Sequence, residues 1–419
     1  MSRIKPRVRD KVKSPFRASS RFGLLFGVHP VFTWLTTMGV TKLGRPHLYE
    51  IDLMRSCVIL GVVCVHLTSY FSQFAQPLSG SRTALDMSLV VLHYTREVFM
   101  FITGLVLFYT YYDRPHPPVL SFWQKRFKLI VIPYLAWNLI YVLFEGTYIR
   151  HFTWSAADVW TMFWMGVVKG NLFFLYYLLV TMQFYVVFPL LWKLLKRFEQ
   201  QQVAIVVASF VLQLVLMATE EYLVPRWQSN PTLPTWVHVF LGYEDSFVLS
   251  YQFWFIAGAV AAVHYTAVQT WLRTHTRAVR WGLVCAILGA WTWFVIARWG
   301  LHQSEADLIT VLQPVMVPYS LIVGGAFLTL GVAWSKRRTE LPRWTKLIQF
   351  FGGASFGIFL IHPLALHFVE QLGYRWYFPM PLHLFELPLS IAAVYVSSGI
   401  VAHWVGKVPV LSYIVGKKG

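Results

Sequence analysis

The chain has 419 residues, of which 57% are hydrophobic and 13% are charged, and its mean hydropathy is +0.53. Soluble domains are typically about 45–50% apolar, so this composition excludes a soluble enzyme with a single membrane anchor. The 36 Lys and Arg residues against 18 Asp and Glu residues give a formal net charge of +18. Such an excess occurs in nucleic-acid-binding proteins and also in membrane proteins with basic cytoplasmic loops.

Ten apolar segments are long enough to cross a bilayer as helices, which takes about 20 residues for a hydrocarbon layer of about 30 Å. The predicted spans are residues 53–74, 90–112, 127–149, 171–193, 202–222, 247–266, 281–299, 308–334, 348–370 and 386–406. The predicted fold class is therefore all-α, a polytopic membrane helix bundle of about ten transmembrane helices. We expect one integral membrane domain over residues 48–406 in the cell membrane, because the chain shows no repeat of fixed period.

The positions of the basic residues predict the orientation of the bundle. With the N-terminus in the cytoplasm, 28 of the 36 Lys and Arg residues lie in cytoplasmic segments and six lie in outer loops. Basic loops remain cytoplasmic, so both termini are predicted to be cytoplasmic, with residues 407–419 as a tail. This bias accounts for the charge, so we expect contact with membrane lipid and no nucleic-acid partner.

The first 47 residues are predicted to form a basic cytoplasmic arm. Residues 22–40 are apolar, but counting them as a further span would place eight preceding basic residues outside. With basic residues on both flanks, this stretch is expected to lie in the inner interface or to re-enter the membrane. On the outer side, the loop of residues 220–245 either covers an external opening or is an ordinary solvated loop.

Ionisable residues within the spans are the first candidates for function, because a charge at mid-bilayer costs on the order of 3 kcal/mol or more. Arg55 and His66 are eleven residues apart in the first span, so they share one helix face about 16 Å apart along the axis. Arg82 and His93 have the same spacing. They straddle an outer loop and the start of a helix, where a shared face cannot be assumed, so we exclude that pair.

Three further ionisable residues fall at the depth of His66, in the outer third of the membrane. They are Arg96 and Glu97 in the second span and His362 in the ninth. If these helix faces converge, the residues form a buried polar site. The alternative is that Arg96 and Glu97 pair with neighbours while the histidines make hydrogen bonds between helices.

On the inner side, Lys125, Arg126 and Lys128 lie at the start of the third span. The general preference for basic residues at the cytoplasmic ends of membrane helices would by itself account for these cations. The functional alternative is that they bind the phosphates of a ligand such as coenzyme A, since Arg offers a planar fork and Lys a point charge. The sequence contains no HExxH, Walker or GxSxG motif and no cysteine pair with zinc spacing, so no metal is expected.

Five segments follow one another in order along the predicted spans. They are Glu50 to Arg55 with the step to His66, Glu97 to Gly104, Lys125 to Lys128 leading to Pro133-Tyr134, Asn171 to Leu178 running to Pro189, and Ser355 to Pro363. Together they resemble the acyltransferase 3 family of integral membrane O-acyltransferases over roughly residues 48–406.

The resemblance implies a function. Members move an acyl group, often acetyl, from cytoplasmic acyl-CoA to a hydroxyl of a surface glycan, lipid-linked sugar or similar acceptor of the cell envelope. The resemblance implies that His66 is the catalytic histidine, that Arg55 is its motif partner and that Arg126 helps to hold the donor. The family's inner motif has a second arginine where this chain has Lys128. Gly104 is assigned to packing, and without a hydrolase-like extension the chain is expected to be of the stand-alone type.

The expected mechanism leaves two roles open for His66. It acts either as a general base on the acceptor hydroxyl or as a carrier of the acyl group. Glu97 is expected to orient or stabilise the imidazolium, and Arg96 or His362 to polarise the thioester carbonyl.

Two other function classes are compatible with the sequence. A transporter or glycan exporter would use the same cavity for translocation and would show discontinuous helices or two related halves. A membrane scaffold would tolerate substitution of His66 and Arg126. The acceptor, the acyl chain and the oligomeric state are not determined by the sequence.

Overall fold

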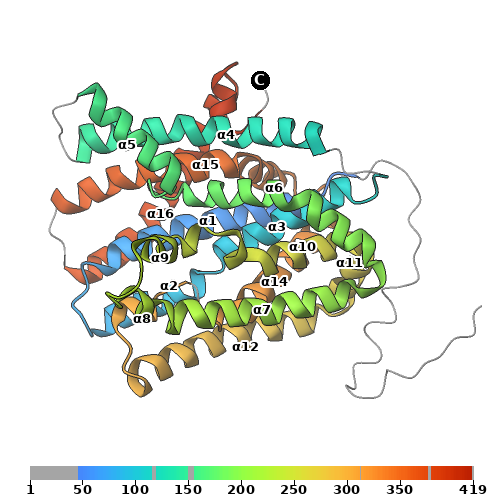
Figure 1. Ribbon diagram of the computed structural model, residues 1–419, viewed down its shortest axis with the longest axis horizontal. Coiled ribbons are helices and arrows are strands. Elements are labelled where there is room, and N and C mark those ends of the chain that lie inside the picture. Colours follow the sequence, from blue (N-terminus) through green and yellow to red (C-terminus); the bar gives the residue numbers. More distant parts are fainter. Residues whose placement is uncertain (1–45, 116–118, 150–154, 312, 376–378, 418–419) are drawn as a thin grey trace, which may run out of the picture. The chain divides into compact units, whose positions relative to one another are not determined.

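The computed structural model describes residues 46–115, 119–149, 155–311, 313–375 and 379–417. Within these residues there is no strand, and nine helices are long and apolar enough to cross a membrane, or ten if one bent pair is a single span. The protein is a multi-pass integral membrane protein with an all-α bundle, which confirms the predicted fold class (Figure 1). The predicted segment at residues 22–40 lies outside the described residues.

The main helices occur in the order in which the spans were predicted. They are α1 (Tyr49–Ser72), α2 (Gly80–Leu92), α3 (Thr95–Tyr111), α4 (Val119–Phe144), α5 (Ala156–Lys169), α6 (Tyr176–Arg197), α7 (Gln202–Tyr222), α8 (Val224–Gln228), α9 (Thr235–Leu241), α10 (Gln252–Val263), α11 (Tyr265–Thr274), α12 (Thr276–Val295), α13 (Glu305–Leu308), α14 (Met316–Arg337), α15 (Pro342–Arg375) and α16 (Met380–Val405). Short turns η4 (Glu244–Ser246), η5 (Val248–Tyr251) and η7 (Leu411–Val415) complete the part that positions the site.

Helix α1 lies inside the bundle and packs against α2, α3, α14, α15 and α16. Its apolar side chains are spread around the helix, and Met54, Val58, Ile59 and Leu67 are all fully buried. A helix that is apolar all round is stable only when other helices surround it. By contrast, α7, α12 and α16 bury few of their apolar side chains inside the protein, as expected for helices that face lipid.

Helix α5 was not predicted, since its residues fall where the sequence indicated an outer loop. Ser155 caps its N-terminus, and Gly170, with φ of +64°, ends it. At 14 residues it spans about 21 Å, which is too short to cross the membrane. The Tyr134 hydroxyl of α4 donates a hydrogen bond to the Val167 carbonyl at 2.7 Å. The chain therefore folds back along α4 before it turns into α6.

The second predicted span corresponds to one candidate span, Gly80–Tyr111, which contains a short break. Helix α2 ends at Leu92, α3 begins at Thr95, and His93 and Tyr94 lie between them. The described residues contain one strongly bent pair, in which a bend of 93° separates α10 from α11. Proline residues often break helices, but α15 continues through Pro363.

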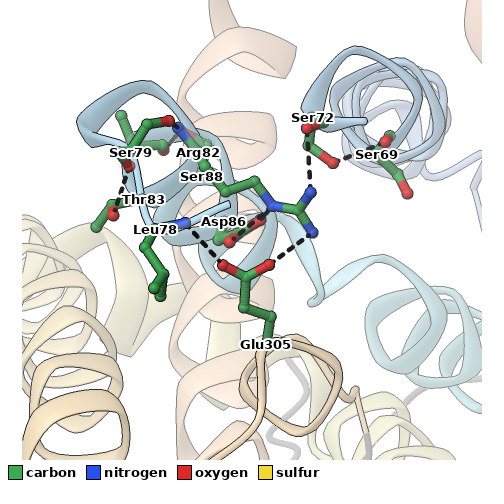
Figure 2. Close-up of polar contacts among 10 residues, drawn as sticks. Ser69, Ser72, Leu78, Ser79, Arg82, Thr83, Asp86, Ser88 and Glu305 are labelled. Atoms are coloured by element: carbon green, nitrogen blue, oxygen red, sulfur yellow. Dashed lines mark hydrogen bonds and ion pairs between the residues drawn. The ribbon is translucent and has the colours of Figure 1, made fainter. Parts of the chain in front are cut away.

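A polar network holds the start of α2 against two neighbouring segments (Figure 2). The Arg82 Nε donates to both carboxylate oxygens of Asp86, at 3.1 and 3.2 Å, and its Nη1 donates to the Ser72 carbonyl at 3.1 Å. Glu305 of α13 lies 3.6 Å from the same guanidinium and accepts a hydrogen bond from the Leu78 amide. The network therefore joins the end of α1 to α2 and α13.

Replacement of Asp86 is expected to destabilise the protein, because its side chain is fully buried and its loss leaves Arg82 without its main partner. We predict that Asp86→Ala lowers the free energy of unfolding by about 3 kcal/mol. Asp158→Ala, which removes an exposed carboxylate, is the control and should cost less than about 1 kcal/mol. Thermal unfolding of the purified proteins in detergent measures both, and equal losses would contradict the prediction.

Two glycines allow α3 and α10 to pack backbone against backbone. A Cβ atom at Gly104 would overlap the Phe255 carbonyl oxygen, and one at Gly258 would overlap the Phe101 carbonyl oxygen. Small residues at such crossings are how membrane helices approach closely. Gly104 therefore has the packing role that the sequence suggested.

Enlargement of either glycine should separate the two helices, since backbone atoms cannot move aside. We predict that Gly104→Ala and Gly258→Ala each cost about 3 kcal/mol or more in unfolding free energy. Gly353→Ala in α15 is the matched control, because nothing lies within 4 Å of the added Cβ, and it should be neutral or slightly stabilising. Thermal unfolding compares the three variants, and a neutral Gly104→Ala would disprove close packing.

Candidate active site

A cavity of about 320 Å³ lies where α1, the break between α2 and α3, the start of α6 and α15 meet. It contains one guanidinium and two imidazoles, and none of its lining residues is acidic. The lining residues are Val62, Val65 and His66 of α1, His93, Thr95, Arg96 and Phe99 around the break, Phe173, Phe174, Tyr176 and Tyr177 around the start of α6, and Val311 and Phe359.

His66 is held in this cavity by ring stacking. Its imidazole lies 3.7 Å from the Phe174 ring, centroid to centroid, at an interplanar angle of 20°. The centroid of the His362 ring lies 5.4 Å from that of the His66 ring, at an interplanar angle of 25°. Neither nitrogen of His66 has a hydrogen-bond partner among the residues that the structure describes. Stacking therefore fixes the plane of the ring while its polar edges remain available to a ligand.

His362 brings a second imidazole beside the first. It is fully buried, and its Nδ1 donates a hydrogen bond to the Phe359 carbonyl at 2.8 Å. A proton on Nδ1 leaves a lone pair on Nε2, which has no partner among the described residues. His362 contacts the site through His66 and Phe174 and is not itself in the cavity wall.

The segment that carries Phe174 is a non-helical loop between α5 and α6. Phe173 has a φ of +48°, in the left-handed region that a phenylalanine rarely adopts. Its ring packs 4.6 Å from that of Tyr141, whose hydroxyl donates to the Leu360 carbonyl at 2.6 Å. Irregular backbone at membrane depth is stable where it lines a cavity. The predicted span at residues 171–193 therefore begins later, at Tyr176, and its first residues shape the site.

Arg96 and Glu97 are neighbours in sequence but differ in position. Arg96 lines the cavity, and its Nη1 donates to the Tyr176 hydroxyl at 3.1 Å and to Asp245 at 2.9 Å. Glu97 is fully buried, does not line the cavity, and neither of its oxygens has a partner among the described residues. Successive residues on a helix differ by about 100°, so only Arg96 is brought to the same space as His66.

The segment η4 contacts Arg96 of the cavity wall through Asp245. Gln183 of α6 anchors this segment, since its side chain bonds the Ser246 carbonyl at 2.6 Å and the Val248 amide at 3.0 Å. Burial, with Asp245 alongside, raises the pKa of Glu244 to about 7.

Arg55 and Arg126 both interact electrostatically with Tyr185, and Arg126 also lies 5.8 Å from the Tyr111 ring. Tyr177, which lines the cavity, interacts electrostatically with Arg55 and Tyr185. Charges on Arg55 and Arg126 are therefore felt by tyrosines in and near the cavity wall.

The other two predicted donor-binding cations differ from Arg126 in exposure. Lys125 and Lys128 are exposed, whereas Arg126 is half-buried. The Lys128 Nζ lies 4.9 Å from the Tyr413 ring in the C-terminal turn η7. The three cations therefore lie near the start of α4 but do not form one cluster.

Several site residues escaped the sequence analysis. His93 was excluded with Arg82, and the two do not act together, because Arg82 pairs with Asp86. His93 nevertheless lines the cavity from the helix break, and its position inside an apolar segment was the signal that could have found it. Asp245 lies far away in sequence and is brought in only by the fold. Among the described residues, no group of three His, Cys, Asp or Glu side chains could hold a metal ion.

The model of a protein family described as "Acyltransferase domain" matches residues 48–403. The chain belongs to this acyltransferase 3 family. A protein of Staphylococcus epidermidis named "Probable poly-beta-1,6-N-acetyl-D-glucosamine export protein" is 24% identical over 321 residues, which are 76% of this chain and 81% of that protein. The sequence of the same name from a further strain of that species matches with the same figures. No solved structure matches the chain.

Family membership supports acyltransferase activity in general terms and confirms the resemblance found in the motifs. The matched region contains Arg55, His66 and Arg126, and His66 lines the cavity. The relative to which the chain is similar is named as a probable export protein of a polysaccharide.

Removal of the stacked ring should uncover one face of His66. We predict that diethyl pyrocarbonate modifies His66 several-fold faster in Phe174→Ala than in the unaltered protein, as measured by peptide mass spectrometry. Phe174→Tyr keeps the stacking and should leave the rate unchanged. The exposed His275 provides the internal reference, and an unchanged His66 rate in Phe174→Ala would show that stacking does not cover the imidazole.

Proposed function

We propose that this protein transfers an acyl group, such as acetyl, from cytoplasmic acyl-CoA to a hydroxyl of an extracytoplasmic glycan, lipid-linked sugar or similar acceptor. The observation that carries the proposal is the placement of His66, the histidine of the family motif, in a cavity inside the helix bundle with both nitrogens unpartnered among the described residues. An imidazole in this state is available for chemistry.

The donor side of the proposal depends on the inner cations. The phosphates of acyl-CoA bind near Arg126, Lys125 and Lys128, and the acyl chain follows Tyr185 and Tyr177 toward His66. This route requires the end of the bundle that carries Arg126 to face the cytoplasm, together with both chain termini. The excess of Lys and Arg in these segments supports that orientation.

Two versions of the chemistry use the same residues. In the first, neutral His66 removes the proton of the acceptor hydroxyl as its oxygen attacks the thioester carbon, and CoA leaves as a thiolate that regains this proton. In the second, a His66 nitrogen attacks the thioester carbon, the carbon–sulfur bond breaks, and CoA leaves as a thiolate that takes the ring proton of the acylated imidazole. The acceptor oxygen then attacks the acyl carbon, the carbon–nitrogen bond breaks, and the hydroxyl proton passes to His66. Label on the protein from radiolabelled acetyl-CoA without acceptor would favour the second version.

The first acceptor to test is a polymer of N-acetylglucosamine. The basis is the printed name of the S. epidermidis relative, which concerns the export of poly-β-1,6-N-acetylglucosamine. Mass analysis of surface polymers from cells with and without this protein identifies acceptor and substituent together.

Replacement of His66 tests the central assignment. We predict that His66→Ala lowers transfer from radiolabelled acetyl-CoA by about 10²-fold or more, while the protein remains in the membrane with an unchanged unfolding midpoint. His275→Ala, which removes an exposed imidazole, is the matched control and should keep full activity. Full activity of His66→Ala would refute the assignment.

Export is a second candidate function that two observations favour. The relative is named as an export protein, and the helix pair α10–α11 is bent by 93° among the described residues, as discontinuous helices are in many transporters. Flux of the glycan into proteoliposomes without acyl-CoA would support export. Labelled acceptor without flux would support transfer.

A further inference from the structure

At the break between α2 and α3, carbonyl groups at the end of α2 have hydrogen-bond donors from other helices, whereas amide groups at the start of α3 lack acceptors among the residues that the structure describes. The Val91 carbonyl in the last turn of α2 accepts a hydrogen bond from the Tyr319 hydroxyl of α14 at 2.6 Å. The Met87 carbonyl, one turn earlier, accepts one from Trp291 Nε1 of α12 at 3.1 Å. Neighbouring helices therefore provide donors for the end of α2, as a broken membrane helix requires.

The amide groups at the start of α3 have no such support. No side chain caps this helix, and the backbone amides of Thr95 and Arg96 have no hydrogen-bond partner among the described residues. The first backbone bond of the helix runs from the Val98 amide to the Tyr94 carbonyl at 2.9 Å. Both Thr95 and Arg96 line the cavity. The positive end of a 17-residue helix therefore opens on the space that contains His66.

Two side chains at the break add polar groups without partners among the described residues. His93 lines the cavity and is 6% exposed, and its Nδ1 has no partner among the described residues. The Arg96 Nε is likewise buried without a partner, while Nη1 of the same guanidinium is held by Tyr176 and Asp245. Asp245 compensates part of the Arg96 charge from outside the cavity. Because no acidic residue lines the cavity, nothing within it satisfies the remaining donors.

We propose that the start of α3, with Arg96 and His93, is a binding site for the negatively charged oxygen that forms on the acyl carbonyl during transfer. This inference rests on the proposed acyl transfer and names the groups that stabilise its intermediate. Helix N-termini and buried arginines bind anionic oxygen in many proteins, and they do so more strongly where water is excluded.

The step balances in bonds and charge. The attacking oxygen of the acceptor, or a nitrogen of His66, forms a bond to the carbonyl carbon, and the electron pair of the C=O double bond moves onto the carbonyl oxygen. That oxygen accepts hydrogen bonds from the α3 amides and the Arg96 Nε. When the double bond re-forms, the carbon–sulfur bond breaks, and the CoA sulfur leaves with the electron pair and takes the proton held by His66.

Kinetics of Arg96 variants test the proposal in the full-length protein. Arg96→Gln is expected to lower kcat with acetyl-CoA by about 10²-fold with little change in the KM for acetyl-CoA, because the lost interaction exists only in the transition state. Arg96→Lys keeps the charge without the Nε–H and should recover part of the rate. Arg226→Gln removes an exposed arginine of α8 outside the cavity and should change neither constant. An unchanged kcat in Arg96→Gln, or a raised KM alone, would overturn the proposal.

A binding measurement separates this proposal from the proposed function. Acetate carries a negatively charged oxygen pair, and acetamide is its neutral counterpart of similar shape. At equal ionic strength and low chloride, acetate should raise the unfolding midpoint of the unaltered protein above that in acetamide, and the difference should vanish in Arg96→Gln. If acyl transfer is absent from every preparation but this difference is present, the proposed function fails and the anion site stands. If acetate and acetamide act alike, the anion site is refuted whatever the activity.

Discussion

Backbone amide and carbonyl groups inside a hydrocarbon layer find no water, so each needs a partner from the protein. This constraint explains why the described part of the chain is helical and why two irregular segments beside the cavity have partners from neighbouring helices. One is the loop before α6, which Tyr141 of α4 supports through ring packing. The other is the break between α2 and α3, where Tyr319 satisfies a carbonyl of α2. Both segments border the same cavity.

The position of α1 inside the bundle brings His66 next to these irregular segments. Because five other helices surround it, a polar residue on α1 meets protein rather than lipid. His66 consequently lies against an aromatic ring from the α5–α6 loop and beside an imidazole from α15. Arg55, eleven residues earlier on the same helix, interacts electrostatically with Tyr185, as Arg126 does. In the proposed acyl transfer, α1 therefore contributes Arg55 on the donor side and His66 in the cavity.

Much of the architecture could be predicted because hydropathy and charge act locally. The ten predicted spans correspond to the nine long helices and the bent pair found in the described residues. The short helix α5 was missed because a helix too short to cross the membrane and a loop can have similar lengths and compositions. The start of α6 was placed too early for a related reason. Residues 171–175 are largely apolar, and an apolar run does not reveal a strained turn such as that at Phe173.

The sequence by itself determined the membrane bundle, the family and the first members of the candidate site, His66 and Arg55. These follow from apolar runs and from spacing along one helix, which are properties of neighbouring residues. Only the tertiary structure decided which other residues meet them. Arg96 lines the cavity and Glu97 does not, although they are adjacent, and His93, Phe174 and Asp245 join from three separate segments. The rotation of each helix about its axis and the positions of helix breaks determine which side chains reach the cavity. Both depend on packing between segments far apart in the chain.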